Sequence, residues 1–268
     1  MAEHDPQQAR QIEDFWRLYL TSGEFEPERR QRRFFRYLPG HTRCKNCYAP
    51  FDGLGSGVVR LLYGKIPSKM NPQLCNICEV YAAKFQGGAE VELTLLFVDV
   101  RGSTSLAEQM TPMDYSRLIN RFYATATQAM VNTDALIDKI IGDQAAGIYV
   151  PGFAGSQHAE RALEAAKRIL AGTGHGGGRT PWIPLGAGIH TGVAFVGSMR
   201  SEEGVSDITV LGDAANIAAR LSSVAGIGEI LISEQASTKI GLEPHGYERR
   251  SIMLKGKSTP VEVVVHPV

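Results

Sequence analysis

The second part of the chain alternates between strand-like and helix-like hydrophobic patterns. A mostly apolar run over Val91–Val100 predicts a strand because it is short and rich in branched side chains. Thr111 and Pro112 have the form of an N-cap followed by a proline in the first helical turn. The helix that they begin would bury apolar residues spaced three or four apart, at Tyr115, Leu118, Ile119, Phe122, Ala126 and Met130.

Shorter segments continue this pattern. Leu136–Ile141 and Ala145–Val150 predict two strands joined tightly at Gly142-Asp143. A helix capped by Ser156 and reaching Leu170 follows, and Pro184–Thr191 starts a fourth strand. The order β-α-β-β-α-β predicts an α+β fold with a ferredoxin-like core. Further elements would extend it, namely a helix around Asn216–Leu221 and strands at Glu229–Ser233, Arg250–Leu254 and Val261–Val265.

The N-terminal part predicts two helices. The first has one apolar stripe, made of Ile12, Phe15, Trp16, Tyr19 and Leu20, and it needs a partner to bury that stripe. The second would be basic and amphipathic, with five arginines between positions 29 and 36 around Phe34 and Phe35. We favour a solvated face on a helix packed against its own domain, with contact to nucleic acid or membrane as the alternative.

The cysteines are confined to one segment. Cys44, Cys47, Cys75 and Cys78 form two Cys-x-x-Cys pairs, and they are the 4 cysteines of the chain. Four thiolates in this pattern suit one tetrahedral metal ion, and zinc is the first choice. An iron-sulfur cluster or a redox dithiol pair stays open as an alternative. The interval between the pairs is rich in proline and glycine, so we expect a loop-rich module that depends on its metal to fold.

Glycines after this module indicate a boundary. The segment 86–89 (QGGA) has the composition of a short hinge. We therefore expect an N-terminal helical segment at 1–40, a four-cysteine metal module at 41–86 and a larger domain at 90–268.

Composition excludes several classes of protein. The chain has 268 residues, of which 43% are hydrophobic, so it can form a substantial core. Its 28 basic and 28 acidic residues balance, which argues against duplex DNA or an anionic membrane as a partner. The longest apolar runs are the length of a strand, and the first ten residues do not resemble a secretion signal. A cytoplasmic location is the expectation.

Two carboxylates mark the candidate chemistry. Asp99 ends an apolar strand just before Gly102, Ser103 and Thr104, a turn whose backbone N–H groups could receive phosphates. Asp143 lies at the tip of the predicted hairpin, and the strand order can bring it beside Asp99. Each aspartate alone could have only a conformational role in its turn. Two carboxylates that share a site, however, repel each other unless cations neutralise them, and a pair of magnesium ions is a common solution.

Five segments together resemble the catalytic domain of class III nucleotidyl cyclases, in that family's order. They span about two thirds of the chain, between Glu90 and Val265. The segments are 97–104 (FVDVRGST), 139–143 (KIIGD), 188–197 (GIHTGVAFVG), 209–220 (TVLGDAANIAAR) and 254–257 (LKGK). The small residues at 144–147 (QAAG) depart from the bulky strand usual there, which bears on efficiency more than on identity.

The resemblance implies a role for each matching residue. Asp99 and Asp143 would bind two Mg²⁺ or Mn²⁺ ions, while Asn216 would orient the ribose and Arg220 would stabilise charge at the α-phosphate. Lys255, rather than Lys257, would contact the triphosphate. The reaction would be attack of the ribose 3′-oxygen on the α-phosphorus, which gives a 3′,5′-cyclic nucleotide and pyrophosphate. Because the family builds each site from two chains, the resemblance also implies a homodimer with two sites.

The base-reading pair of the family matches Lys139 and Thr209. An ammonium and a hydroxyl complement N1 and the 6-amino group of adenine, whereas guanine reverses both groups, so ATP is the expected substrate. Threonine at position 209 resembles subclass IIIb, some members of which respond to bicarbonate. Cyclisation of GTP, CTP or UTP remains an alternative, as does a catalytically weak nucleotide-binding sensor whose metal module signals to a partner.

Overall fold

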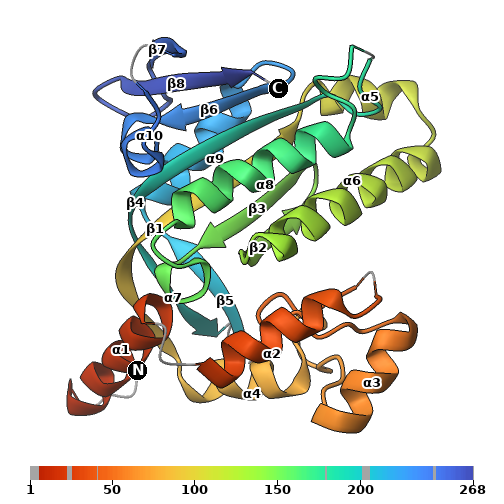
Figure 1. Cartoon of the computed structure of the whole chain (residues 1–268), viewed down its shortest axis with the longest axis vertical. Coiled ribbons are helices and arrows are strands. Elements are labelled where there is room, and N and C mark those ends of the chain that lie inside the picture. Colours follow the sequence, from red (N-terminus) through yellow and green to blue (C-terminus); the bar gives the residue numbers. More distant parts are fainter. Residues whose placement is uncertain are drawn as a thin grey trace. The chain divides into compact units, whose positions relative to one another are not determined.

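A computed structural model of the chain describes residues 6–22, 26–40, 42–178, 180–200, 206–243 and 246–267 (Figure 1). The chain forms two compact units. The first combines Met1–Val91 with Val150–Gly155 and Ala194–Leu211, and the second combines Glu92–Tyr149, Ser156–Val193 and Gly212–Val268. Each unit is described below by itself.

The second unit supplies most of the predicted β-α-β-β-α-β order, while the helix at 151–154 and the strand at 206–211 belong to the first unit. The chain passes from β1 (Gly87–Val100) through α5 (Ser103–Gln109) and α6 (Pro112–Asn132) to the hairpin of β2 (Leu136–Ile141) and β3 (Gln144–Tyr149). After α7 (Pro151–Ala154) and α8 (His158–Gly172) it enters β4 (Leu185–Arg200). The remaining elements are β5 (Ser206–Leu211), α9 (Asp213–Val224), β6 (Glu229–Ser233), α10 (Glu234–Ile240), β7 (Glu248–Ile252) and β8 (Val261–Pro267).

The sheet order confirms the α+β class and its ferredoxin-like core. Strands follow the order β2-β3-β1-β4-β6-β8-β7, with β5 paired to β4 off this path. β3 runs antiparallel to both β1 and β2, while β4 and β6 are parallel, as a connection through a helix requires. The expected helix around Asn216 and the three additional strands are present as α9, β6, β7 and β8.

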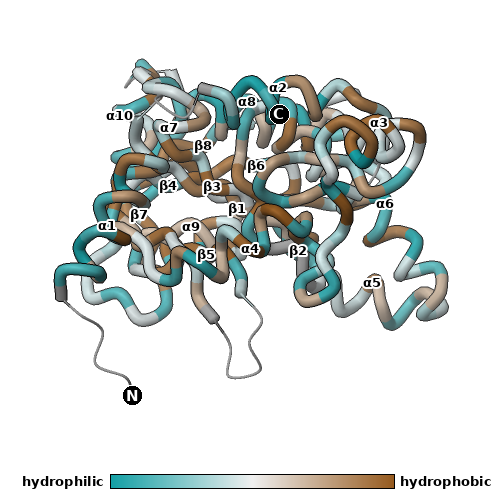
Figure 2. Tube along the Cα trace, turned by 90° about the horizontal axis from the view of Figure 1, so that it is seen from below, coloured by the Kyte–Doolittle hydropathy of each residue, from teal (hydrophilic) through white to brown (hydrophobic). Residues whose placement is uncertain are grey.

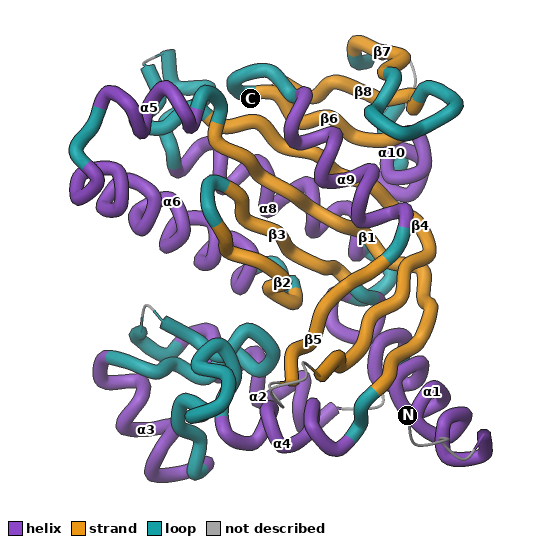
Figure 3. Tube along the Cα trace, turned by 180° about the vertical axis from the view of Figure 1, so that it is seen from behind, coloured by secondary structure: helices purple, strands orange, loops and turns teal. Residues whose placement is uncertain are grey.

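Helices cover both faces of the sheet in this unit. α6 and α8 pack side by side on one face, and α9 lies on the other (Figures 1 and 3). Figure 2 shows hydrophobic residues along the central strands β1, β3 and β4. Beneath α9, Ile217 and Leu221 pack in one buried cluster with Leu231, Leu254 and Val263. Burial of such side chains is the main stabilisation of the unit, at roughly 1.5–3 kcal/mol for each.

The first unit contains four N-terminal helices. They are α1 (Pro6–Thr21), α2 (Glu26–Tyr37), α3 (Gly53–Tyr63) and α4 (Asn76–Lys84). The apolar stripe of α1 is confirmed, because Trp16 and Leu20 are buried. In α2, Phe35 and Arg32 are buried while Arg33 is exposed, so the helix packs against its own unit as we favoured.

The interval between the cysteine pairs differs from the expected loop. Residues 53–63 form helix α3, which begins after Asp52 in an extended conformation and ends at Gly64 in the left-handed conformation. Gly53, Gly55 and Gly57 lie within the helix and Gly64 ends it, so the glycines of this interval do not prevent helix formation.

The glycines at 87 and 88 do not form a hinge. Both residues belong to β1, and an added Cβ at Gly88 would lie only 2.4 Å from the carbonyl oxygen of Val196 and 2.7 Å from Cα of Gly197. The glycines are therefore needed for close approach of two backbones, which composition alone does not distinguish from flexibility.

The helix after β3 begins later than expected. Val150 precedes the short helix α7, Gly155 has φ of +77° at its end, and Ser156 lies in the following turn. Gln157, rather than Ser156, therefore occupies the N-cap position of α8.

Within the part of the chain that the structure describes, no helix combines the length and the apolar character that a bilayer crossing requires.

Candidate functional site

Asp99 lies at the end of the buried strand β1. Its neighbours Phe97 and Val98 are buried, and Asp99 pairs in register with Gln144 of β3. The strand thereby presents a carboxylate at the edge of the core, where the Asp99 side chain is 13% exposed. Burial raises the pKa of the Asp99 carboxyl, the Arg101 guanidinium lowers it, and the charge of Asp143 raises it, with a net rise.

Asp143 lies in the tight turn between β2 and β3, next to the end of β1. The backbone N–H of Val100 donates to the carbonyl oxygen of Asp143 at 3.0 Å, and the Tyr123 hydroxyl donates to the carbonyl oxygen of Gly142 at 2.7 Å. These bonds fix the turn beside Asp99, as the strand order predicted. The pKa of the Tyr123 hydroxyl is raised, first by burial and then by the charge of Asp143.

Arg101 joins this pair of carboxylates, and the sequence analysis gave it no role. Its guanidinium forms an ion pair with Asp99 and donates to the carbonyl oxygen of Ser223 in α9. Its backbone N–H donates to the carbonyl oxygen of Pro184 at 2.8 Å. The signal that could have found it is its position two residues after Asp99, at the strand end where a buried carboxylate needs a counter-charge.

The hydroxyl-rich turn lies at the start of α5. Gly102 is the N-cap residue, while Ser103 and Thr104 occupy the first turn, with Thr104 exposed. The structure thus places these residues directly after the Asp99–Arg101 pair. Phosphate binding there stays a prediction.

Asn216 and Arg220 lie one turn apart on α9. Asn216 is exposed and Arg220 is half-buried. The helix approaches β4 closely, because a Cβ added at Gly188 would lie 2.3 Å from the backbone nitrogen of Ser222. Glycine in the 188–197 motif therefore sets how near α9 comes to the sheet.

The loop after β7 meets the start and the middle of α9. A Cβ at Gly256 would lie 3.4 Å from both terminal nitrogens of the Arg220 guanidinium. The Lys257 ammonium donates to Asp213 at 2.7 Å, whereas Lys255 is exposed. Lys257 thus has a partner within the protein, and the exposed Lys255 fits the expected role of a triphosphate contact better.

The two expected base-reading residues lie on different strands. Thr209 is half-buried in β5 and pairs in register with Gly197 of β4. Lys139 belongs to β2, but its side chain lies outside the described residues.

The four cysteines come together in the first unit. Their sulfur atoms all lie within 4.8 Å of one another, all four residues are buried, and all are free thiols. Cys47 and Cys75, from different pairs, have their sulfurs 3.7 Å apart. One tetrahedral ion bound through four thiolates fits this donor set.

Groups around the cluster stabilise negative charge on sulfur. The backbone N–H of Cys75 donates to Cys44 Sγ at 3.3 Å, and the Asn46 amide donates to Cys78 Sγ at 3.5 Å. Lys65 Nζ lies 3.9 Å from Cys75 Sγ. Burial alone would lower the pKa of the Lys65 ammonium, but the neighbouring sulfurs raise it. Such outer-shell donors are expected around a thiolate-bound metal.

The cysteine segment is also tied to strand β5. Lys45 lies between Cys44 and Cys47, is buried, and donates to the carbonyl oxygen of Ile208 at 3.0 Å while pairing with Asp207. Asn71 donates to the carbonyl oxygen of Ser206 at 3.1 Å. Neither residue could be predicted from the sequence, because hydrogen bonds to backbone groups more than a hundred positions away leave no local pattern.

Comparison with known proteins identifies the family. Residues 88–267 match the family model of the adenylate and guanylate cyclase catalytic domain. The chain therefore belongs to the class III adenylate and guanylate cyclase family. Catalytic domains of this family bind a nucleotide substrate, dimerise and use Mg²⁺ or Mn²⁺.

Individual relatives include both kinds of cyclase. An adenylate cyclase of Anabaena cylindrica is 30% identical over 218 residues, which are 76% of this chain and 41% of that protein. A terminal-differentiation-specific adenylate cyclase of Dictyostelium discoideum is 30% identical over 179 residues, 64% of this chain and 8% of that protein. The chain thus spans less than half the length of these curated relatives.

Solved structures have the same fold. The adenylyl cyclase CyaB from P. aeruginosa aligns with a TM-score of 0.59 and 26% identity over 68% of this chain and 96% of that one. A guanylyl cyclase aligns with a TM-score of 0.58 and 26% identity over 67% of this chain and 93% of that one. These matches establish a nucleotidyl cyclase domain.

Proposed function

We propose that this protein is an adenylate cyclase that converts ATP to 3′,5′-cyclic AMP and pyrophosphate. The observation that carries the proposal is the pair of carboxylates at Asp99 and Asp143, held together by the ends of β1 and the β2–β3 turn. The raised pKa of Asp99, caused first by burial and increased by Asp143, indicates a site where added positive charge is stabilising. Oxygen ligands of this kind suit Mg²⁺ and Mn²⁺.

The residues of this chain would each perform one task. Asp99 and Asp143 would hold two divalent cations, which when bound promote deprotonation of the 3′-hydroxyl and neutralise the triphosphate. The bond formed joins the 3′-oxygen to the α-phosphorus, and the bond broken releases pyrophosphate. Arg220 would donate to the α-phosphate as its charge develops, an effect worth on the order of 10³-fold by analogy with arginine fingers.

Other residues would orient the substrate. Asn216 would hydrogen-bond the ribose, because it is exposed one turn before Arg220 on the same helix. Lys255 and the turn at Gly102, Ser103 and Thr104 would contact the triphosphate. Lys139 and Thr209 would select adenine, which favours ATP over GTP, CTP and UTP.

The active unit would be a homodimer. The family forms each site from two chains, so the carboxylates of one protomer would meet Asn216 and Arg220 of its partner. This chain contains a full set of these residues, so two equivalent sites are proposed.

We propose zinc for the four cysteines. Bonds of about 2.3 Å in a tetrahedral zinc site place sulfurs about 3.8 Å apart, which agrees with the Cys47–Cys75 sulfur separation of 3.7 Å. A cluster with several irons would need its cysteine sulfurs farther apart. Elemental analysis of the purified protein should find about one zinc per chain and no visible absorption, whereas a brown protein containing iron would contradict the assignment.

The metal module would also regulate the cyclase through β5. Lys45 and Asn71, which belong to the cysteine segment, bond to Ser206, Asp207 and Ile208, and the next residue is Thr209. Order in the metal module would therefore influence the strand that presents a base-reading side chain.

Reduced thiols and a nucleotide substrate favour the cytoplasm as the location.

A direct assay tests the proposed function. The full chain with Mn²⁺ and each of ATP, GTP, CTP and UTP should release cyclic AMP and pyrophosphate fastest from ATP. Asp99→Ala and Asp143→Ala should abolish turnover while the circular dichroism spectrum is retained. Glu108→Gln, at an exposed position of α5, is the control that should keep full activity.

The same assay separates the alternatives. Preferential turnover of another nucleotide would replace ATP as substrate, and saturable nucleotide binding without product would favour the sensor. Near-normal activity in either aspartate variant would refute the two-cation site.

A further inference from the structure

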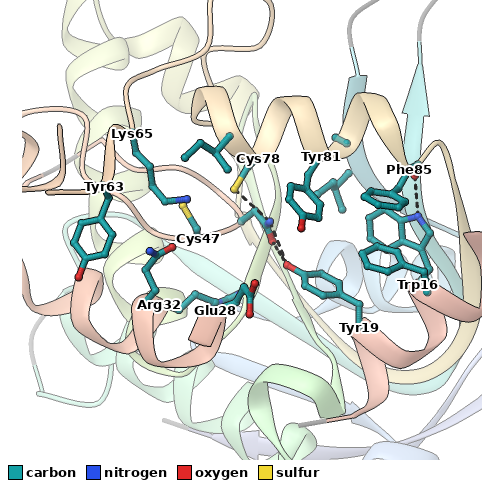
Figure 4. Close-up of a pocket in the computed structure, with 16 residues that line it drawn as sticks. Trp16, Tyr19, Glu28, Arg32, Cys47, Tyr63, Lys65, Cys78, Tyr81 and Phe85 are labelled. Atoms are coloured by element: carbon teal, nitrogen blue, oxygen red, sulfur yellow. Dashed lines mark hydrogen bonds between the residues drawn. The ribbon is translucent and has the colours of Figure 1, made fainter. Parts of the chain in front are cut away.

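The first unit contains a cavity of about 240 Å³ beside the four-cysteine cluster. Helices α1, α2 and α4 supply most of its wall, and Cys47 and Cys78 supply part of the rest. Figure 4 shows the rings of Trp16, Tyr19, Tyr81 and Phe85 at one end, with Lys65 and Cys47 at the other. The cavity lies within the first unit, and none of the residues proposed for the cyclase reaction lines it.

Aromatic rings in fixed positions line one end of the cavity. Phe15 stacks on Phe85 with 4.3 Å between ring centroids, and Tyr81 lies 5.4 Å from Phe85. The indole N–H of Trp16 donates to the carbonyl oxygen of Phe85 at 2.9 Å, which anchors α1 to the end of α4. A planar ring inserted here would meet ring faces and edges in the arrangements that aromatic pairs prefer.

Two polar side chains of the wall lie where they can orient a ligand. The Tyr19 hydroxyl and the Asn46 side chain are hydrogen-bonded at 3.3 Å, and Asn46 also donates to Cys78 Sγ. Both residues line the cavity. A ligand with one hydroxyl or ring N–H could therefore bond to this pair, which lies between the aromatic end and the metal cluster.

The charges near the cavity disfavour an anionic ligand. Arg32 is buried with its guanidinium carbon 4.2 Å from the Tyr48 ring centroid and 4.1 Å from that of Phe153. Lys65 lies against the sulfur of Cys75. Both cations thus already face electron-rich groups, and the Glu28 carboxylate in the wall and a thiolate-bound zinc add negative charge, so an anion gains no free counter-charge.

The volume favours two fused rings. A dry cavity of about 150 Å³ accommodates benzene, and this one is larger at about 240 Å³. We infer that the cavity binds a small fused-ring aromatic molecule that carries no negative charge and whose hydrogen-bonding group contacts Tyr19 and Asn46. Cys47 and Ile208 in its wall connect an occupant to the metal cluster and to β5.

Calorimetric titration of the full, metal-containing chain tests this inference with 2-naphthol and 2-naphthoate, which share their rings and differ in charge at neutral pH. Saturable binding of 2-naphthol is expected below about 1 mM, at least about tenfold tighter than that of 2-naphthoate. Tyr19→Phe should weaken 2-naphthol about fivefold through loss of one hydrogen bond.

Two tryptophan variants of α4 give a matched control. Ile77 lines the cavity and is 38% exposed, whereas Val80 is on the same helix, is 60% exposed and does not line it. Ile77→Trp should weaken 2-naphthol at least about tenfold by filling the space, and Val80→Trp should bind it like the unchanged chain. Thermal unfolding of each variant establishes that it is folded.

The inference would be overturned by absence of saturable 2-naphthol binding, by equal binding of 2-naphthoate, or by equal loss in both tryptophan variants. Unchanged affinity in Tyr19→Phe would remove the assigned orientation. Because binding is read without nucleotide, none of these outcomes bears on the cyclase proposal.

Discussion

At the scale of single residues, His190 couples burial to acid sensitivity. It lies in β4, is 6% exposed, and its Nδ1 is 2.8 Å from the Ser233 hydroxyl. Burial lowers the pKa of His190 to about 4; the charge of Asp213 opposes this shift by raising the pKa, and the charge of Lys257 adds to it by lowering the pKa. A histidine that burial keeps neutral costs no stability while it is also neutral in the unfolded chain. It lowers stability once the unfolded chain binds a proton there.

Stability should therefore fall as the pH drops from about 6.5 towards about 4, because the unfolded chain binds a proton at position 190 that the folded chain excludes. The difference between those two pKa values corresponds to about 3 kcal/mol as an upper limit. Urea unfolding at several pH values would measure the loss, and His190→Gln should reduce it. The pKa values of His158 and His175 are also lowered, so the variant should keep part of the slope. An unchanged slope would exclude His190 as a source.

Arg101 shows a residue whose importance depends on its surroundings. The sequence predicted a carboxylate at the end of β1, but not that an arginine two positions later would both neutralise Asp99 and bond to Ser223 of α9. The sequence shows that the Asp99 carboxylate needs a counter-charge. The packing of α9, whose Ser223 carbonyl accepts from Arg101, determines that Arg101 supplies it.

At the scale of elements, strand β5 depends on a residue of the cysteine segment. Lys45 is 4% exposed and bonds to Ile208, and it pairs with Asp207. Lys45→Met should lower the free energy of unfolding by about 1–3 kcal/mol, since it leaves a buried carbonyl oxygen without this donor. Chemical unfolding would measure the change, and nucleotide turnover should fall because β5 carries Thr209.

Lys69 provides the control for this variant. It is an exposed lysine of the same segment, and Lys69→Met should change stability by no more than about 0.5 kcal/mol. Equal effects of the two substitutions would show that loss of charge, rather than loss of the contacts to β5, is responsible.

Elements with regular local patterns were predicted best. Thr111 caps α6 as expected, accepting from the backbone N–H of Asp114, and the apolar run of β1 forms a buried strand. Helices α3 and α10 and strand β5 were not predicted, since each is short and its apolar positions show neither period clearly. Packing against α6 explains the glycine at position 147 of β3, because a Cβ there would lie 3.2 Å from Met130 Sδ.

At the scale of the whole molecule, removal of the metal should affect the two units differently. The cluster lies in the first unit, where it joins the segment of Cys44 and Cys47 to that of Cys75 and Cys78, while the second unit has its own core under α9. A chelator should therefore increase hydrogen exchange in α3, α4 and β5 and leave α6 and α8 protected. Unchanged exchange in α4 after proven metal loss would contradict a structural role for the metal.

The proposed homodimer predicts complementation between inactive variants. Asp99→Ala and Arg220→Ala should each be inactive alone. Mixed and allowed to exchange subunits, they should recover up to about a quarter of the normal activity, because half of the dimers are mixed and each of those has one intact site. No recovery, despite demonstrated exchange, would mean that each chain holds its site alone.

The sequence by itself determined the β-α-β-β-α-β order, the family and the grouping of four cysteines, because local periodicity and short motifs specify these features. It also placed Asp99 beside Asp143, since the strand order leaves little choice. Only the tertiary structure decided the partner of Asp99, the hydrogen bonds from Lys45 and Asn71 to β5, and the aromatic cavity beside the cysteines. Each of these depends on side chains from segments far apart in the chain, and their meeting is set by packing rather than by any local pattern.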